Sequence, residues 1–129
     1  MERRSGGCHC GAVTFEVTGP VREVIYCHCG QCRKQSGHVV AATAGGDDQL
    51  SVSGAENLTW YSASETARRG FCKTCGSHLF WKAHGSDATS IMAGSIDTPT
   101  GLHSGYHIHV DDKGDYYEIA DGLPQFAQR

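Results

Sequence analysis

The sequence predicts a mostly β protein, and three observations support this prediction. Short runs in which apolar and polar residues alternate recur along the chain, and this is the period of a half-buried strand. Turn residues interrupt these runs at short intervals, and the 129 residues include 17 glycines. No long segment keeps the 3.6-residue period of an amphipathic helix. We therefore expect residues 1–129 to form one domain of antiparallel β-sheets with a short helical turn.

The first part of the chain contains a lead-in and two predicted strands. Residues 1–7 are polar and glycine-rich, and we expect them to fray. From 13 to 18 apolar and polar residues alternate, which predicts a strand, and the glycine–proline pair at 19–20 ends it. Residues 21–26 form a second β-favouring run that leads directly into a cysteine.

The rest of the chain is predicted to hold one short helix and a series of strands. Residues 31–36 have the length of one or two helical turns, and Gly37 provides a stop. The apolar run at 38–44 is short and ends in a glycine pair, which favours a strand. The remaining predicted strands are β-favouring runs between turn signals, at residues 50–54, 58–61, 66–71, 77–82, 90–97, 106–110 and 116–119. Residues 125–129 are expected to fray.

Composition and charge exclude several classes of protein. The formal net charge is −3, the sequence pI is about 6.2, and no run of Lys and Arg is longer than two residues. Surfaces that bind nucleic acid or an anionic membrane depend on clustered cations, so we expect neither partner. No apolar stretch reaches the ~18 residues of a transmembrane helix, and no apolar signal-peptide core follows Met1. We therefore expect a soluble, cytoplasmic protein.

All seven cysteines lie in three clusters, at 8–10, 27–32 and 72–75. An odd number leaves one thiol over in a closed set of disulfides, and a reducing cytosol disfavours disulfides altogether. Two of the clusters also contain the C-x-C spacing, which would close a very tight disulfide ring. Clustered thiols in such a compartment are typical of a metal site, and zinc is the metal that four thiolates favour.

Seven thiolates divide naturally into a four-ligand set and a three-ligand set. Four ligands close a structural zinc site, whereas three leave a position for a further ligand. One division places the four-ligand set at Cys8, Cys10, Cys72 and Cys75 and the three-ligand set at Cys27, Cys29 and Cys32. A zinc ribbon of Cys29, Cys32, Cys72 and Cys75 is an alternative, which leaves Cys8, Cys10 and Cys27 as the three. Spacing alone does not choose between them.

The three-ligand set at 27–32 indicates a site that takes up a small thiol. A centre made of soft thiolates prefers another sulfur in its open position, and a thiol held there as thiolate is a nucleophile at neutral pH. Cys32 lies near a predicted helix start, where backbone N–H groups favour a thiolate. The alternative is that His28, His78 or another side chain fills the fourth position, so that the site is purely structural.

Four motifs together resemble one known family. They are CHCGAVTF at 8–15, CHCGQCRKQSG at 27–37, FCKTCGSHL at 71–79 and DGLP at 121–124. They resemble the glutathione-dependent formaldehyde-activating enzyme (GFA) family, also called the centromere-protein-V domain family, over nearly the whole chain.

The resemblance implies a fold, two zinc ions and an activity. The implied fold is Mss4-like, built from several antiparallel β-sheets. The implied ligands are Cys8, Cys10, Cys72 and Cys75 for a structural zinc and Cys27, Cys29 and Cys32 for a catalytic zinc. The implied reaction joins the sulfur of glutathione to formaldehyde, which is carbon–sulfur lyase chemistry, and the implied partners are a small thiol and an aldehyde.

Several other residues are candidates for contacts with a substrate. Arg33 and Lys34 follow the third cysteine of the 27–32 cluster and are predicted to meet the carboxylates of a glutathione-like ligand, with a solvated helix face as the alternative. His28 is predicted to point away from the metal, toward the substrate or into packing. His107 and Asp121 are assigned structural roles.

Two other functions compete with the enzyme. A non-catalytic zinc module that binds a macromolecule is one, although the chain shows no basic or disordered tail that would favour it. A redox-responsive zinc protein is the other, because an exposed cysteine set can lose its metal on oxidation.

Overall fold

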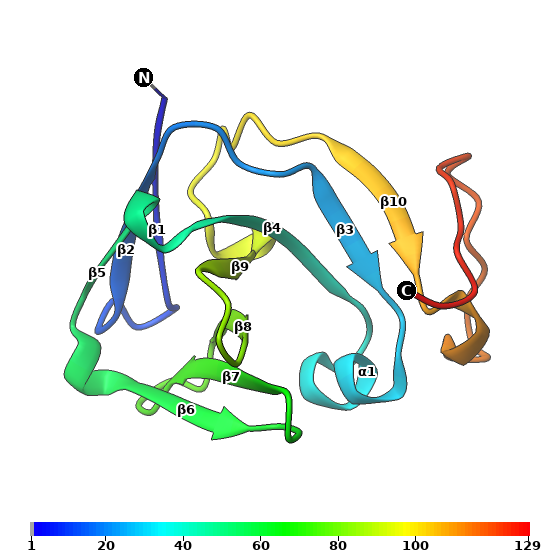
Figure 1. Ribbon diagram of the computed structural model, residues 1–129, viewed down its shortest axis with the longest axis horizontal. Coiled ribbons are helices and arrows are strands. Elements are labelled where there is room, and N and C mark those ends of the chain that lie inside the picture. The colour runs from blue at the N-terminus through cyan, green and yellow to red at the C-terminus, as the bar shows by residue number, and fades with distance from the viewer. Residues whose placement is uncertain (1) are drawn as a thin grey trace.

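A computed structural model describes residues 2–129 and arranges ten strands in two sheets (Figure 1). The smaller sheet consists of β1 (Arg3–Gly7), β2 (Thr14–Thr18) and β5 (Leu50–Ser53), with β2 in the middle. The larger sheet contains β3 (Val24–Cys27), β4 (Val40–Gly46), β6 (Leu58–Ser62), β7 (Ala67–Cys72), β8 (His78–Ala83), β9 (Ala88–Met92) and β10 (Ser104–Ile108). Its strand order is β10-β3-β4-β9-β8-β7-β6.

One α-helix, α1 (Gly30–Ser36), follows β3 directly. Its backbone ends at Gly37, which has a φ of 86° and donates its N–H to the carbonyl of Arg33, so the predicted glycine stop is confirmed. Single 3₁₀ turns connect other elements, at Asp47–Gln49, Ala55–Asn57, Ala93–Ser95 and Val110–Asp112. Within residues 2–129, no helix has the length and apolar character needed to cross a lipid bilayer.

The core divides into two groups of buried side chains. The larger one lies between the sheets and includes Val13, Phe15 and Val17, whose alternation predicted the strand that is now β2. The ring of Phe15 meets that of Phe80 from β8 edge-on, with centroids 5.4 Å apart. The smaller group packs around Cys32, next to α1. Both groups contain cysteines, so each cysteine set is embedded in a packed region.

The mostly β prediction is confirmed, with one difference in strand direction. All paired strands are antiparallel except β10 and β3, which run parallel. Antiparallel neighbours are joined by short turns, whereas parallel neighbours need a long connection. The chain between β3 and β10 passes through six other strands and returns to the sheet edge, and this length allows the parallel pairing.

The N-terminal segment is more ordered than its composition predicts. Residues 3–7, which we expected to fray, form β1 and pair with β2 along the whole strand; Met1 lies outside the described residues. Glycine favours this pairing for a steric reason. A Cβ added at Gly6 would lie 2.3 Å from the backbone oxygen of Ser95 and 2.5 Å from the ring of Phe15, so only glycine lets the strand approach the core this closely.

The C-terminal segment also differs from its prediction. Residues 116–119 form no strand, because the hydroxyls of Tyr116 and Tyr117 bind histidine rings instead. Residues 125–129 do not fray: Gln125 forms a bridge with His107, and the N–H of Phe126 donates to the His107 carbonyl. The predicted strand at 90–97 is split into β9 and a 3₁₀ turn.

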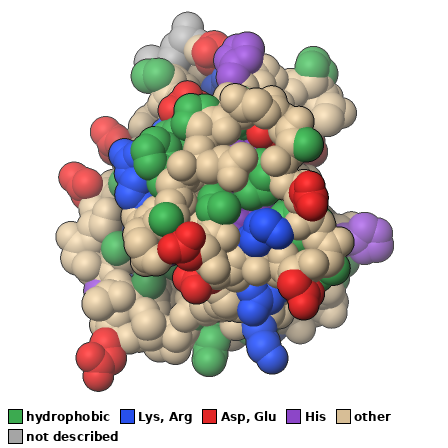
Figure 2. Space-filling view, turned by 90° about the vertical axis from the view of Figure 1, so that its right-hand side faces the viewer, with side chains coloured by type: hydrophobic (Ala, Val, Ile, Leu, Met, Phe, Trp, Pro, Cys, Tyr) green, Lys and Arg blue, Asp and Glu red, His purple; other side chains and the backbone are tan. Residues whose placement is uncertain are grey.

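Helix α1 and the C-terminal coil lie at the end of the molecule opposite the small sheet, as Figure 1 shows. The face at this end has apolar side chains gathered in a hollow, with basic and acidic side chains around it (Figure 2). This end contains the 27–32 cysteines and the segments packed against them.

Candidate functional site

Four cysteine sulfurs meet where the small sheet joins the large one. Cys8 and Cys10 lie in the turn between β1 and β2, Cys72 is the last residue of β7, and Cys75 lies in the turn that leads to β8. The four sulfurs are all within 4.8 Å of one another. The Cys8–Cys10 and Cys10–Cys72 sulfurs are 3.6 Å and 3.7 Å apart. The structure thus groups the four thiols of the first division, and not those of the zinc-ribbon alternative.

This four-cysteine site has the geometry of a tetrahedral zinc site. Zn–S bonds near 2.3 Å place tetrahedral sulfurs about 3.8 Å apart, which agrees with the two sulfur–sulfur distances. Backbone N–H groups already point at two of the sulfurs: Val13 N donates to Cys8 (3.3 Å) and Thr74 N donates to Cys72 (3.4 Å). The Ser77 hydroxyl is 3.2 Å from the Cys75 sulfur, and it is the largest cause that lowers the pKa of Cys75 to about 5.

The three remaining cysteines form a separate cluster at the start of α1. Cys27 ends β3, Cys29 is the N-cap of α1, and Cys32 lies in its first turn. Their sulfurs are also within 4.8 Å of one another. The N–H of Cys32 donates to the Cys29 sulfur at 3.3 Å, so the free amide at the helix start stabilises charge on Cys29 rather than on Cys32.

Charge in this three-cysteine site is concentrated on Cys32. A hydrogen bond with the Cys27 thiol, followed by one from the Arg69 guanidinium (3.4 Å), lowers the pKa of Cys32 to about 5. The same bond between the two cysteines, together with burial, raises the pKa of Cys27. The cluster therefore holds negative charge readily, and its three soft donors fit zinc.

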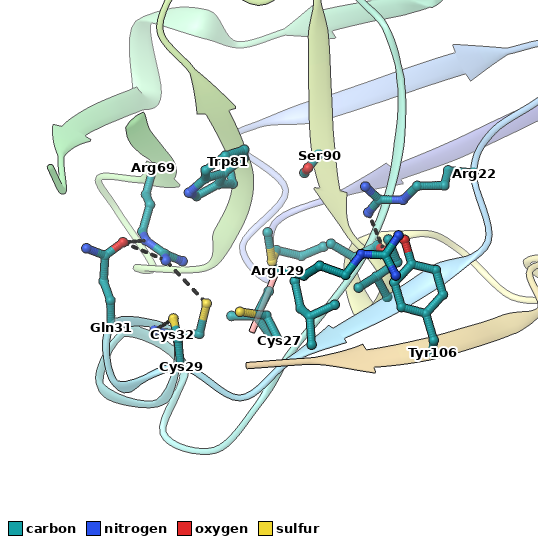
Figure 3. A pocket seen from close by; sticks show the side chains of 15 residues that line it. Arg22, Cys27, Cys29, Gln31, Cys32, Arg69, Trp81, Ser90, Tyr106 and Arg129 are labelled. Atoms are coloured by element: carbon teal, nitrogen blue, oxygen red, sulfur yellow. Dashed lines mark hydrogen bonds between the residues drawn. The ribbon is translucent and has the colours of Figure 1, made fainter. Parts of the chain in front are cut away.

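A cavity of about 370 Å³ opens beside the three-cysteine site (Figure 3). The sulfur-bearing residues and Arg69 lie at one end, and Arg22, Tyr106 and Arg129 lie at the other (Figure 3). Apolar side chains form much of the wall between them, including Val40, Ala42, Trp81, Met92 and Ile108. No residue of the four-cysteine site lines this cavity.

Among residues 2–129, the cationic side chains that line the cavity are those of Arg22, Arg69 and Arg129, and the lining includes no Asp or Glu side chain. Arg22 donates to the backbone carbonyls of Ala42 (2.9 Å) and Glu23 (3.3 Å), and burial lowers its pKa. The Arg129 guanidinium lies over the Tyr106 ring, 5.2 Å from its centroid. A cavity with cationic groups at both ends favours an anionic ligand over a neutral or cationic one.

The residues predicted to contact a substrate lie elsewhere. Arg33 and Lys34 belong to α1 but are not among the cavity-lining residues. Arg33 donates from Nη1 to the carbonyl of Asp112 at 2.6 Å, which ties the helix to the last 3₁₀ turn. His28 also lies outside the cavity lining, so the structure does not bring these three residues together with the open end of the cysteine site.

His28 belongs to a buried hydrogen-bonded chain behind the three-cysteine site. Its Nδ1 binds the Tyr117 hydroxyl, its Nε2 is 2.8 Å from His107 Nδ1, and His107 Nε2 is 2.8 Å from Asp121 Oδ2. His28 and His107 are 3% and 5% exposed. Burial, followed by repulsion from His107, lowers the pKa of His28 to about 4. His28, which lies between Cys27 and Cys29 in sequence, is thus held in place by hydrogen bonds to the C-terminal part of the chain.

The family model of the glutathione-dependent formaldehyde-activating enzyme matches residues 3–112. The chain belongs to this family. The match covers both cysteine sites and the segments that connect them. The family that the sequence motifs resemble is therefore confirmed, with three of the four motifs inside the matched residues and the motif at 121–124 outside them.

Two other proteins and one crystal structure are similar to the chain over most of its length. A Halomonas elongata protein provisionally named glutathione-dependent formaldehyde-activating enzyme is 32% identical over 127 residues, 88% of this chain and 79% of that protein. An uncharacterized lyase of Schizosaccharomyces pombe is 28% identical over 98% of this chain and 93% of its own. The crystal structure of a Rhodobacter sphaeroides protein is similar with a TM-score of 0.58 and 26% identity, covering 95% of this chain and 98% of that one.

The sequence did not identify the three cavity arginines of this GFA-family chain. Arg22 lies close to Cys27 along the chain but outside the cysteine motifs, whereas Arg129 is far from the 27–32 cysteines in sequence and comes from the C-terminal coil. For Arg69, however, the sequence pattern contains a signal that could have identified it as a buried residue. It lies two residues after Ala67 in the predicted strand at 66–71, so both side chains point to the same face of the strand, and both are buried. A charged residue at an inward position of a strand is rare without a functional partner.

Proposed function

We propose that the protein is a zinc-dependent carbon–sulfur lyase that acts on the adduct of a small, glutathione-like thiol with formaldehyde or a related aldehyde. One observation carries this proposal. The three-cysteine site, which is one ligand short of closure, lines the cavity, whereas the complete four-cysteine site does not. Family membership and the name of the Halomonas elongata relative support the same substrates.

The two cysteine sets would hold their metals for different purposes. Cys8, Cys10, Cys72 and Cys75 would hold a structural zinc that joins the two sheets. Cys27, Cys29 and Cys32 would hold the second zinc, which when bound supplies a Lewis-acid centre that lowers the pKa of an added thiol.

The chain's own groups then bring the reactants together. The reaction forms a bond between the thiol sulfur and the carbonyl carbon, moves the π electrons of the C=O bond to oxygen, and transfers the thiol proton to that oxygen. The apolar wall of the cavity excludes water from the sulfur end, and the arginines at the far end hold the anionic part of the thiol. Confining both reactants lowers the entropic part of the barrier.

The proposal is tested by measuring zinc content and catalysed exchange on the same samples. Wild type, Cys32→Ser and the helix control Gln35→Ser are compared. Exchange between ¹³C-formaldehyde and its glutathione adduct is followed by NMR, since the uncatalysed reaction gives a baseline. We expect two zinc ions and faster exchange in wild type and Gln35→Ser, but one zinc ion and only the baseline rate in Cys32→Ser.

Two results would contradict the proposal. One is a wild-type protein that holds both zinc ions and leaves the exchange rate at its baseline. The other is a folded Cys32→Ser protein that has lost one zinc ion and still accelerates exchange, since this would separate the activity from the three-cysteine site.

A further inference from the structure

Arg69 is a buried cation with no carboxylate partner. Its side chain projects from β7 to the three-cysteine site, and the residue is 2% exposed. Nε and Nη2 donate to Gln31 Oε1 at 3.1 and 2.8 Å, and Nη2 also donates to the Cys32 sulfur at 3.4 Å (Figure 3). Nη1 is buried and has no hydrogen-bond partner. Within residues 2–129, the ion pairs involve other cations.

A buried guanidinium needs a compensating negative charge. Removing a charge from water is strongly unfavourable when no counter-ion balances it, and an arginine does not lose its proton to avoid this cost. The amide oxygen of Gln31 is neutral and offers only part of the compensation. The group that Arg69 contacts and that can carry a full negative charge is the sulfur of Cys32.

Arg68, the neighbour of Arg69 on β7, does not reach the three-cysteine site. Arg68 projects to the other face of β7, where its guanidinium lies over the Trp60 ring at 4.3 Å from the centroid, and it is only partly buried. The strand therefore offers two adjacent arginines, of which one faces the thiolates. The pair provides a matched comparison within one strand.

The charges of the three-cysteine site match this single arginine. Three thiolates exceed the charge of Zn²⁺ by one, and one guanidinium balances that excess. A further anion entering the site then meets a neutral centre instead of a negative one. In the four-cysteine site the excess negative charge is compensated differently, because Cys10 is exposed and water can screen its charge.

We propose that Arg69 is the positioning residue that balances the charge of the three-cysteine site and so allows that site to accept an anionic thiol rather than a neutral ligand. This inference rests on the proposed function of the site. According to this inference, the preference of the site for a thiolate depends on Arg69, which is 37 positions from Cys32 along the chain. Gln31, held between Cys29 and Cys32 in α1, keeps the guanidinium in place.

The first test compares Arg69→Gln with Arg69→Lys and Arg68→Gln. Zinc retention is measured by competition with a chromophoric chelator, and glutathione binding by titration. Loss of a partner of a metal ligand typically lowers metal affinity by about 10- to 100-fold. We expect Arg69→Gln to keep the four-cysteine zinc, to hold the second zinc at least about tenfold more weakly, and to lose glutathione binding. Arg68→Gln should match wild type, and Arg69→Lys should recover part of the loss because it restores the charge.

A merely structural role for Arg69 predicts a different pattern. If the arginine only fills space, Arg69→Lys and Arg69→Gln should lose the second zinc equally. That result, or an Arg69→Gln protein with wild-type zinc retention and glutathione binding, would overturn the inference.

Wild-type protein gives a second measurement that does not depend on how the variants fold. With Co²⁺ in place of zinc, thiolate-to-cobalt absorption reports ligands entering the three-cysteine site. Glutathione should change this absorption at a lower concentration than neutral imidazole, and the reverse order would overturn the inference. If wild type takes up no thiol and catalyses no exchange, the proposed function fails, and the zinc competition of the Arg69 variants still decides the role of the arginine.

Discussion

Substitution of Cys75 by serine tests whether the four-cysteine site holds the fold together. The site joins the turn after β1 to the turn after β7, and Cys10 and Cys72 are 62 residues apart in the chain. A cross-link that closes a loop of this length stabilises a protein by about 4 kcal/mol through the entropy of the unfolded chain. Native domains have a total free energy of unfolding of roughly 5–15 kcal/mol, so Cys75→Ser should remove a large part of it.

The matched control is Cys27→Ser, which removes one thiol from the three-cysteine site. Its ligands lie within a short stretch of chain, from Cys27 to Cys32, and closing so short a loop contributes only about 2 kcal/mol by the same relation. Urea denaturation of the zinc-loaded proteins measures both free energies of unfolding. We expect the loss for Cys75→Ser to be about twice the loss for Cys27→Ser.

The reasoning would be refuted by a Cys75→Ser protein as stable as wild type. It would equally be refuted if Cys27→Ser were the more destabilised of the two, because the long-range link would then involve the other cluster. Zinc content measured on the same samples separates these cases. Cys75→Ser should lose the structural zinc, whereas Cys27→Ser should lose only the second one.

Three further predictions concern the metal sites and the backbone. A chelator of graded strength should remove one zinc ion per chain well before the other, because the three-cysteine site lacks a fourth protein ligand; zinc analysis and circular dichroism should show metal loss before unfolding. Gly54→Ala should lower the free energy of unfolding by at least about 2 kcal/mol in urea, since Gly54 has a φ of 79° and its new Cβ would lie 1.9 Å from the Ala12 oxygen. Asp121→Asn should weaken the second zinc about tenfold in chelator competition, because it removes the charged end of the hydrogen-bonded chain that fixes His107 and His28; the free energy of unfolding should stay close to that of wild type, since Asp121 is exposed.

The strands could be predicted because their signal is local. Alternation at 13–18 fixes which side chains of β2 face the core. In β8 the adjacent residues Leu79 and Phe80 are both buried, at 0% and 1% exposed, so the β-favouring apolar run and not alternation predicted that strand. The failures are segments whose structure is decided by distant partners. The N-terminal glycines form β1 because β2 offers a free edge. The tyrosines at 116–117 favour a strand by composition, yet their hydroxyls meet the rings of His28 and His38.

The metal sites show the same division between local and distant information. The spacing of the cysteines within each cluster indicates candidate metal ligands, because C-x-C and C-x-x-C pairs are local. Which clusters join depends on contacts between residues far apart in the chain, and spacing left two divisions open. The pairing of β7 with β8 places Cys72 at the end of β7 and Cys75 in the turn that follows it, and the fold brings Cys72 to Cys10.

The position of a charge along the chain was a poor guide to its position in the site. Arg33 and Lys34 follow Cys32 in sequence, but a helix turns its side chains through about 100° per residue, so they leave the face on which Cys32 is buried. Arg69 comes from β7 and reaches the same sulfur. A strand can deliver a side chain to a distant site only through the pairing of the sheet, and that pairing is not encoded in the motif.

Identical ligands serve two purposes in this fold because their surroundings differ. In the four-cysteine site two thiols come from each of two segments, so a metal held there would link the two sheets, and the cavity that could admit a reactant lies elsewhere. In the three-cysteine site all the thiols come from one short segment, so no long-range link depends on it, and these three cysteines line a cavity. The four-cysteine site thus provides the long-range link, whereas the three-cysteine site adjoins the cavity, and this difference is why we propose that the incomplete cysteine set is the one that acts on a substrate.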